Sequence, residues 1–165
     1  MHKASYDEME RRLAEVLLSL PAGAVVVDIG SQNINGSYRP LIPEPYRYIG
    51  VDRVAGRNVD IVMTAEYETG LTDGAVDLVI SGQCLEHVRN PFRMMAEIDR
   101  ILKPGGLVII AAPFQFPEHR FPVDCWRFLP DGMRAMFDEA GLECTEAYLS
   151  GIDCWGIGRR AVGND

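Results

Sequence analysis

Two aspartates stand near the ends of apolar stretches in the first third of the chain. Asp28 belongs to residues 25–30 (VVVDIG), and Asp52 ends residues 48–52 (YIGVD). Such stretches are typical of buried strands in a parallel sheet. A carboxylate at the carboxyl end of a strand lies where open α/β sheets bind ligands, and on the second strand it can accept both ribose hydroxyls. The pair indicates an adenosine-bearing cofactor, although each aspartate could instead only cap its own loop.

The loop after the first stretch lacks the glycine spacing of a dinucleotide site. It reads Gly30-Ser31-Gln32-Asn33-Ile34-Asn35-Gly36, whereas a pyrophosphate requires GxGxxG. Gly30 permits a sharp turn or a close approach of the backbone to a ligand. A carboxylate at Asp28 would repel a pyrophosphate and attract a cation. These charges favour S-adenosylmethionine, which carries an ammonium and a sulfonium group and no phosphate.

Two histidines and an aspartate could move a proton. His87 follows the fourth apolar stretch, and His119 and Asp124 lie in the polar and aromatic segment 118–129 (EHRFPVDCWRFL). Histidine suits proton transfer near neutral pH, so His119 or His87 is expected to act as a base, with Asp124 orienting it. Alternatively, His87 caps a helix and Asp124 forms ion pairs that order the segment. A divalent metal is a further alternative, but the spacing matches no recognised ligand motif, so no metal is expected.

The composition indicates a single domain over residues 1–165. Of these residues, 47% are hydrophobic and 24% are charged, as in ordinary globular proteins. The net charge of −8 opposes attraction to nucleic acid or an anionic membrane. No apolar run is long enough to span a bilayer, and the first residues do not form a signal peptide. Cys84, Cys125, Cys144 and Cys154 form no CxxC pair; reduced thiols and a cytoplasmic location are expected.

The pattern of apolar residues predicts the elements that position these groups. Residues 5–20 form an amphipathic helix with a capping box at Ser5 and Glu8. The first crossover is irregular because Pro40, Pro43 and Pro45 interrupt it. Asn90 and Pro91 start a helix that ends at residues 103–106 (KPGG). Further strands are predicted at residues 59–63, 75–80, 107–112 and 142–149, a further helix at 131–140, and the tail 151–165 either adds an edge strand or frays.

The order of these motifs resembles the class I S-adenosylmethionine-dependent methyltransferases, particularly those called methyltransferase type 11. The resemblance covers a core of about residues 24–149, and it is carried by VVVDIG, YIGVD, VDLVISGQCLEHV and ILKPGGLVIIAAP. It implies an α/β fold that is Rossmann-like and doubly wound, with a mostly parallel sheet and helices on both faces. The segment 123–142 is also similar to methyltransferases found beside sugar and polysaccharide genes.

The resemblance also implies a cofactor site at the strand tips. Asp28 and Gly30 would lie near the methionine part, and Asp52 would hold the ribose. The usual first loop has further glycines where this chain has Gln32 and Ile34, so side chains could crowd the methionine part. The full set of expected cofactor-binding residues is Asp28, Gly30, Ser31, Gln32, Asp52, Arg53, Ala65, Glu66, Ser81, Gly82 and Gln83. Ala65 and Glu66 would border the adenine, and residues 81–83 would line the methyl-transfer side.

The sequence therefore predicts an S-adenosylmethionine-dependent methyltransferase that acts on a small-molecule or sugar-like acceptor, at oxygen. Transfer is an in-line displacement, so alignment of the reactants supplies most of the rate. A non-catalytic binding or regulatory module is the alternative, because the glycine loop is altered. A nicotinamide-dependent oxidoreductase is disfavoured by the missing GxGxxG.

Overall fold

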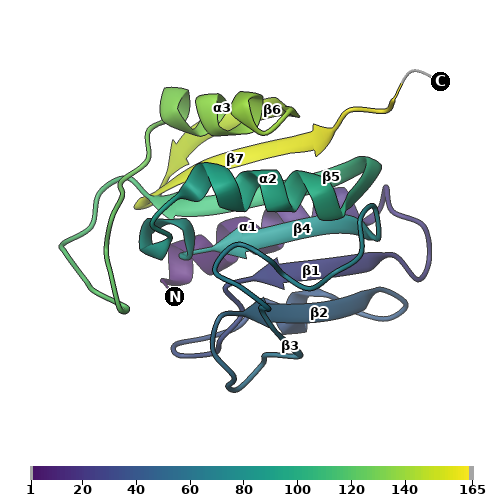
Figure 1. Ribbon diagram of the computed structural model, residues 1–165, viewed down its shortest axis with the longest axis horizontal. Coiled ribbons are helices and arrows are strands. Elements are labelled where there is room, and N and C mark those ends of the chain that lie inside the picture. Colours follow the sequence, from purple (N-terminus) through teal and green to yellow (C-terminus); the bar gives the residue numbers. More distant parts are fainter. Residues whose placement is uncertain (1, 164–165) are drawn as a thin grey trace.

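A computed structural model describes residues 2–163 of the chain. Seven strands form one sheet in the order β3-β2-β1-β4-β5-β7-β6 (Figure 1). The strands are β1 (Val25–Ile29), β2 (Arg47–Asp52), β3 (Ile61–Val62), β4 (Val76–Gly82), β5 (Leu102–Pro113), β6 (Leu142–Ser150) and β7 (Asp153–Arg160). The helices are α1 (Lys3–Leu17), α2 (Pro91–Ile101), α3 (Pro130–Glu139) and the 3-10 turns η1 (Arg39–Leu41) and η2 (Leu85–His87).

The first five strands are parallel to one another, and β7 is antiparallel to both β5 and β6. Helices α2 and α3 cover one face, and α1 covers the other (Figure 1). The methionines Met94, Met95 and Met133 pack on the first face, and Met9 packs on the second. The expected doubly wound, mostly parallel sheet with helices on both faces is confirmed.

Most of the predicted elements form, with informative exceptions. Helix α1 begins at Lys3, before the expected residue 5, and its N-cap is His2. The predicted capping box at Ser5 is wrong, because the Ser5 hydroxyl is buried and donates to the carboxylate of Asp153. Asn90 does cap α2, since its side chain accepts the backbone amide of Arg93. The first crossover holds only η1, as its prolines indicate.

The tail differs most from the expectation of an edge strand or a frayed end. Residues 153–160 form β7, which inserts between β5 and β6 and pairs with both. The outer strand at this end of the sheet is therefore β6. Insertion brings Asp153, the first residue of β7, to the carboxyl ends of the parallel strands, opposite Pro113 at the end of β5. Residues 164 and 165 of the predicted tail lie outside the described residues.

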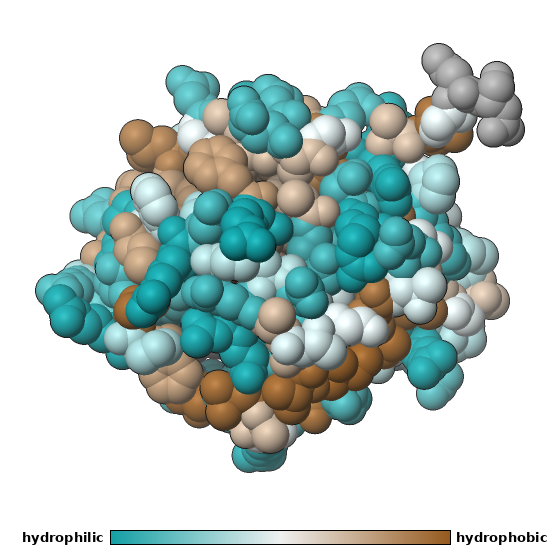
Figure 2. Space-filling view, in the orientation of Figure 1, coloured by the Kyte–Doolittle hydropathy of each residue, from teal (hydrophilic) through white to brown (hydrophobic). Residues whose placement is uncertain are grey.

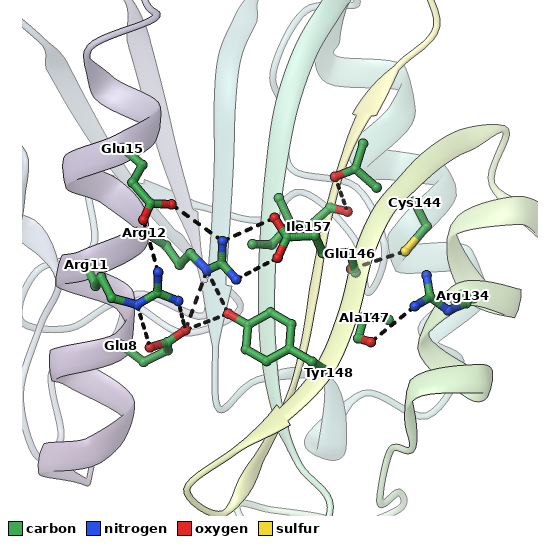
Figure 3. A network of polar contacts seen from close by, with 11 residues as sticks. Glu8, Arg11, Arg12, Glu15, Arg134, Cys144, Glu146, Ala147, Tyr148 and Ile157 are labelled. Carbon is green, nitrogen blue, oxygen red and sulfur yellow. Dashed lines mark hydrogen bonds and ion pairs between the residues drawn. The ribbon is translucent and has the colours of Figure 1, made fainter.

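A polar network ties α1 to β6 (Figure 3). The Arg12 guanidinium donates to the Tyr148 hydroxyl at 2.7 Å and to Glu146 at 2.6 Å. The Tyr148 hydroxyl in turn donates to Glu8 at 2.6 Å. These contacts fix α1 across the antiparallel end of the sheet. Ser5, near the start of α1, contacts Asp153 at the carboxyl ends of the parallel strands, which we call the binding edge.

The opposite end of the sheet has a short outer strand and exposed apolar side chains. Strand β3 has two residues, and Val54 and Val62 nearby are 58% and 46% exposed. Figure 2 shows an apolar band along the lower margin of this view, where β2 and β3 lie in Figure 1. Among the described residues, no helix is long and apolar enough to cross a membrane.

Candidate functional site

The first loop turns sharply at Gly30, directly after β1. Gly30 has φ +83°, and its amide donates to the carbonyl oxygen of Val51 at 2.9 Å. A Cβ at this position would lie 2.6 Å from the Cβ of Cys84. Both the backbone angle and the approach of Cys84 require glycine here. The turn therefore joins the tips of β1 and β2 to the segment that follows β4.

Asp28 is buried behind this turn. One of its oxygens accepts the hydroxyl hydrogen of Tyr48 at 2.6 Å. Burial raises the pKa of Asp28 to about 7, although the Tyr48 hydrogen bond opposes the shift. The carboxyl group is therefore close to its titration point at neutral pH. A ligand cation that approached this tip would favour the ionised form.

Asp52 lies at the tip of β2 and is partly exposed. Its carboxylate accepts the backbone amide of Gln32 at 3.0 Å and that of Val54 at 3.2 Å. These two bonds orient the side chain between the first loop and the loop after β2. Each carboxylate oxygen keeps a lone pair, so Asp52 can still accept hydroxyl hydrogens from a ligand.

The altered positions of the first loop do not fill the turn at Gly30. The Gln32 side chain packs on Gly56, where a Cβ would lie 2.6 Å from Gln32 Nε2. Ile34 is 53% exposed. The Gln32 side chain therefore contacts the loop after β2, and the Ile34 side chain faces solvent. Ser31 also faces this loop, because its hydroxyl donates to the carbonyl oxygen of Asn58.

The three expected residues at the tip of β4 have different surroundings. Ser81 is buried, and its hydroxyl donates to the Ile29 carbonyl, which ties β4 to β1. Gly82 lies against the ring of Tyr38. Gln83 adopts φ +58° and donates from Nε2 to Asp153 at 2.6 Å. A strained residue of this kind at a strand tip is typical of a ligand site.

A cavity of about 350 Å³ brings three other expected residues together. Arg53 follows β2, and Ala65 and Glu66 follow β3. The remaining lining comes from Met63, Arg89, Pro122 and Val123. Residues expected to border an adenine thus share one hollow with the tip of segment 118–129.

The two candidate bases meet beside the turn after β4. The imidazole rings of His87 and His119 are 4.8 Å apart and nearly perpendicular. Glu86 Oε1 lies 3.6 Å from His87 Nε2 and 3.9 Å from His119 Nε2. Burial raises the pKa of Glu86 to about 8 and lowers the pKa of His87. We call Glu86, His87 and His119 the acid–imidazole cluster.

Asp124 contacts His119 of this cluster through both its backbone amide and its ring. Its carboxylate accepts the His119 backbone amide at 2.8 Å and two hydrogen bonds from Arg127, at 2.6 and 2.8 Å. The contact with Arg127 holds the pKa of Asp124 well below its usual range. Asp124 Oδ2 is also 3.5 Å from His119 Nδ1. The aspartate therefore both orders the segment and lies where it can orient the ring.

Three polar groups at this edge are buried, and sequence reasoning assigned no role to two of them, Glu86 and Asp153. Glu86 precedes His87 in the motif LEHV, so its position was visible, but its complete burial was not. The Tyr38 hydroxyl is buried and has no hydrogen-bond partner among residues 2–163. Asp153 accepts from both Ser5 and Gln83. Its place at the edge depends on the antiparallel insertion of β7, which the local pattern does not contain.

Comparison with known families decides the class of the domain. The family described as "Methyltransferase domain" matches residues 25–110, which includes β1 to β4 and most of β5. The chain belongs to this methyltransferase family. The matched segment contains the turn at Gly30, Asp52 and the LEHV motif.

Individual relatives agree with this assignment. An uncharacterized methyltransferase of Mycobacterium leprae is 30% identical over 103 residues, which are 55% of this chain and 38% of that protein. A tRNA (carboxymethyluridine(34)-5-O)-methyltransferase of Macaca fascicularis is 33% identical over 109 residues, 59% of this chain and 16% of that protein. The chain thus spans well under two thirds of the length of either relative.

A solved methyltransferase structure has the same fold. The 1,6-didemethyltoxoflavin-N1-methyltransferase of Burkholderia thailandensis, with bound 1,6-didemethyltoxoflavin and S-adenosylhomocysteine, superposes with a TM-score of 0.75. The match covers 96% of this chain and 79% of that one at 16% identity. The expected Rossmann-like methyltransferase domain with S-adenosylmethionine as its cofactor is confirmed.

The residues of this methyltransferase domain fit the cofactor. Asp52 offers oriented acceptors for a ribose, and the buried Tyr38 hydroxyl near Gly82 can donate to a carboxylate. The side chains of Gln32 and Ile34, which replace the usual glycines, are turned to other contacts. The tip thus keeps the polar groups that a sulfonium-bearing nucleoside needs, without phosphate-binding glycines.

Proposed function

We propose that the domain transfers a methyl group from S-adenosylmethionine to an oxygen of a small-molecule or sugar-like acceptor. The observation that carries this proposal is the acid–imidazole cluster beside the turn after β4, at the same sheet edge as Gly30 and Asp52. The cofactor supplies an electrophilic methyl group. An oxygen acceptor must lose its proton to attack, and the acceptor loses that proton beside this cluster.

Each remaining polar group has a binding role in this proposal. Asp52 holds the ribose hydroxyls, and Arg53, Ala65 and Glu66 border the base in their shared cavity. Asp28 and the turn at Gly30 form the end of the site that receives the amino-acid part. Gln83 lines the side that faces the acceptor, held by its bond to Asp153.

The acceptor class follows from charge and from the segment around His119. The net charge of −8 opposes a polyanionic acceptor such as tRNA, the substrate named for the Macaca relative. Phe121 and Trp126 are 53% and 41% exposed on the same segment. Exposed rings beside a polar cluster suit the apolar face of a sugar better than they suit a phosphate backbone.

We also propose that residues 1–165 form one domain and that the protein works in the cytoplasm. Every described strand joins the same sheet. All four cysteines are unpaired, as expected in a reducing compartment.

Calorimetry and labelled transfer together test the proposal. S-adenosylhomocysteine should bind with one site per chain, and radiolabelled S-adenosylmethionine should label a hydroxyl in a panel of sugars and other small alcohols. A parallel panel of amines, tRNA and proteins tests the other acceptor classes. Binding without transfer to any panel would favour the non-catalytic module, and no binding at all would contradict the proposal.

A further inference from the structure

Glu86 is a fully buried carboxyl group with an unusual environment. Its relative exposure is 0%. Within residues 2–163, neither of its side-chain oxygens has a hydrogen-bond partner. Burying a carboxylate without a partner is costly. Oε1 lies 3.6 Å from His87 Nε2 and 3.9 Å from His119 Nε2.

The His87 ring presents a lone pair to Glu86. Its Nδ1 lies 2.6 Å from the carbonyl oxygen of Val123. A carbonyl oxygen can only accept, so Nδ1 carries the hydrogen and donates it. In the neutral ring, Nε2 is then unprotonated. A backbone carbonyl on the far nitrogen is one of the common partners by which proteins orient a metal-binding imidazole.

The His119 ring is oriented in the same way. Its Nδ1 is 3.3 Å from the carbonyl oxygen of Pro117 and 3.5 Å from Asp124 Oδ2, and both of these atoms are acceptors. Arg127 fixes Asp124 through its paired hydrogen bonds. The neutral His119 ring therefore also carries its hydrogen on Nδ1. Its Nε2 faces Glu86 as a second lone pair.

We propose that Glu86, His87 and His119 bind one divalent transition-metal ion such as Zn²⁺. Their ligand atoms all lie within 4.8 Å of one another. Tetrahedral Zn²⁺ with bonds of about 2.0–2.1 Å holds neighbouring ligand atoms roughly 3.3–3.4 Å apart. The 3.6 and 3.9 Å separations need only small side-chain adjustments. Two imidazoles and one carboxylate leave a coordination position for another ligand, and His119 lies on the exposed segment 118–129.

The metal site goes beyond the proposed function, and only its catalytic meaning depends on that function. A cation beside the acceptor hydroxyl would make the hydroxyl more acidic. The two imidazoles would then act as ligands, and the proton would leave to solvent water. The binding of the ion can be tested without cofactor or acceptor.

Titration of the full, tag-free chain with Co²⁺, followed by visible absorption, tests the site. We expect one Co²⁺ per chain with the ligand-field bands of a low-coordinate site, and Zn²⁺ should displace it. His119→Ala and the isosteric Glu86→Gln should each weaken binding on the order of 100-fold or more. The control is His2→Ala, which removes the third histidine of the chain and should leave the affinity within about twofold.

Three results would overturn the metal site. They are no stoichiometric Co²⁺ binding, binding that survives both His119→Ala and Glu86→Gln, and binding that is lost in His2→Ala alone. Circular dichroism of the metal-free variants checks their folding, and His119→Ala on the exposed segment carries the test if Glu86→Gln unfolds. Failure of the Co²⁺ titration with intact S-adenosylhomocysteine binding would reject the metal and leave the proposed function standing.

Discussion

The hydroxyl of Tyr48 on β2 donates a hydrogen bond to the buried carboxyl group of Asp28 on β1, at 2.6 Å. The guanidinium of Arg39 lies over the Tyr48 ring, 4.2 Å from its centre. The acid at the first strand tip is therefore held from the neighbouring strand. Burial has the largest effect on the pKa of Asp28 and raises it. The stability of the fold around the binding edge should therefore depend on pH.

Asp28 should make the protein less stable as the pH rises from about 4 to 7. Its folded pKa of about 7 lies above the ordinary value of 3.8 for an aspartate, so the native state binds more protons than the unfolded state in this window. The free energy of unfolding then falls with rising pH, on the order of 3–4 kcal/mol for this group. Denaturant unfolding of wild type and Asp28→Asn across this range measures the difference.

Tyr48→Phe is the matched control for Asp28. It removes the donor that favours the ionised carboxyl, so the loss of stability should continue to higher pH than in wild type. Parallel stability curves for wild type and Asp28→Asn from pH 4 to 7 would show that Asp28 does not titrate in this way.

Asp52→Ala should weaken binding of S-adenosylhomocysteine by roughly ten- to a hundredfold. The carboxylate is the proposed partner of the ribose, and it also accepts the amides of Gln32 and Val54. Calorimetry gives the affinity, and thermal unfolding shows whether the loop is also loosened. Asp138→Asn changes an exposed acid on α3 and should leave affinity unchanged. Wild-type affinity in Asp52→Ala with an unchanged melting temperature would remove the ribose role.

Gly30→Ala should destabilise the fold as well as weaken cofactor binding. The added Cβ meets both a positive φ and the side chain of Cys84, at a cost on the order of 1–3 kcal/mol. A double-mutant cycle with Cys84→Gly, which removes both the Cβ and the Sγ of Cys84, separates the two effects. Relief of part of the destabilisation in the double variant would confirm the contact, and strict additivity would leave the backbone angle as the only cause.

His119→Ala and His87→Ala should slow methyl transfer by roughly 10²–10⁴-fold at saturating cofactor. Both rings belong to the acid–imidazole cluster, beside which the acceptor oxygen is proposed to lose its proton. Neither ring is a proposed cofactor contact. Affinity for S-adenosylhomocysteine should therefore stay close to that of wild type. His2→Ala controls for the loss of an imidazole. A loss of only a few-fold in both variants would show that the two histidines are structural.

The parallel half of the fold was predictable because its signals are local. Each apolar stretch carries its own strand, and Asn90, Pro91 and the prolines of the first crossover mark their boundaries. The third strand, Ile61–Val62, is shorter than the predicted residues 59–63, although the Asp60 amide still donates to the Gly50 carbonyl and the Asp60 carboxylate accepts the Gly50 amide.

The site was predictable only in outline. The tips of parallel strands converge, so Gly30, Asp52 and His87 could be assigned to one edge from their order alone. The burial of Glu86 and the position of Asp153 depend on long-range packing. Asp153 reaches the edge because β7 runs back between two strands that precede it in the sequence. No pattern within residues 151–160 encodes that choice of partners.

The antiparallel direction of β7 also determines at which terminus a purification tag or a surface attachment should be placed. The start of α1 lies at the binding edge, where the ring of His2, its N-cap, lies 5.0 Å from that of Phe116, itself 4.8 Å from the His119 ring. The chain leaves β7 at Arg160, at the opposite end of the parallel strands (Figure 1). A polyhistidine tag on the amino terminus would place extra imidazoles beside His119 and compete for its metal. Immobilisation through the carboxyl terminus keeps the binding edge turned toward the solution.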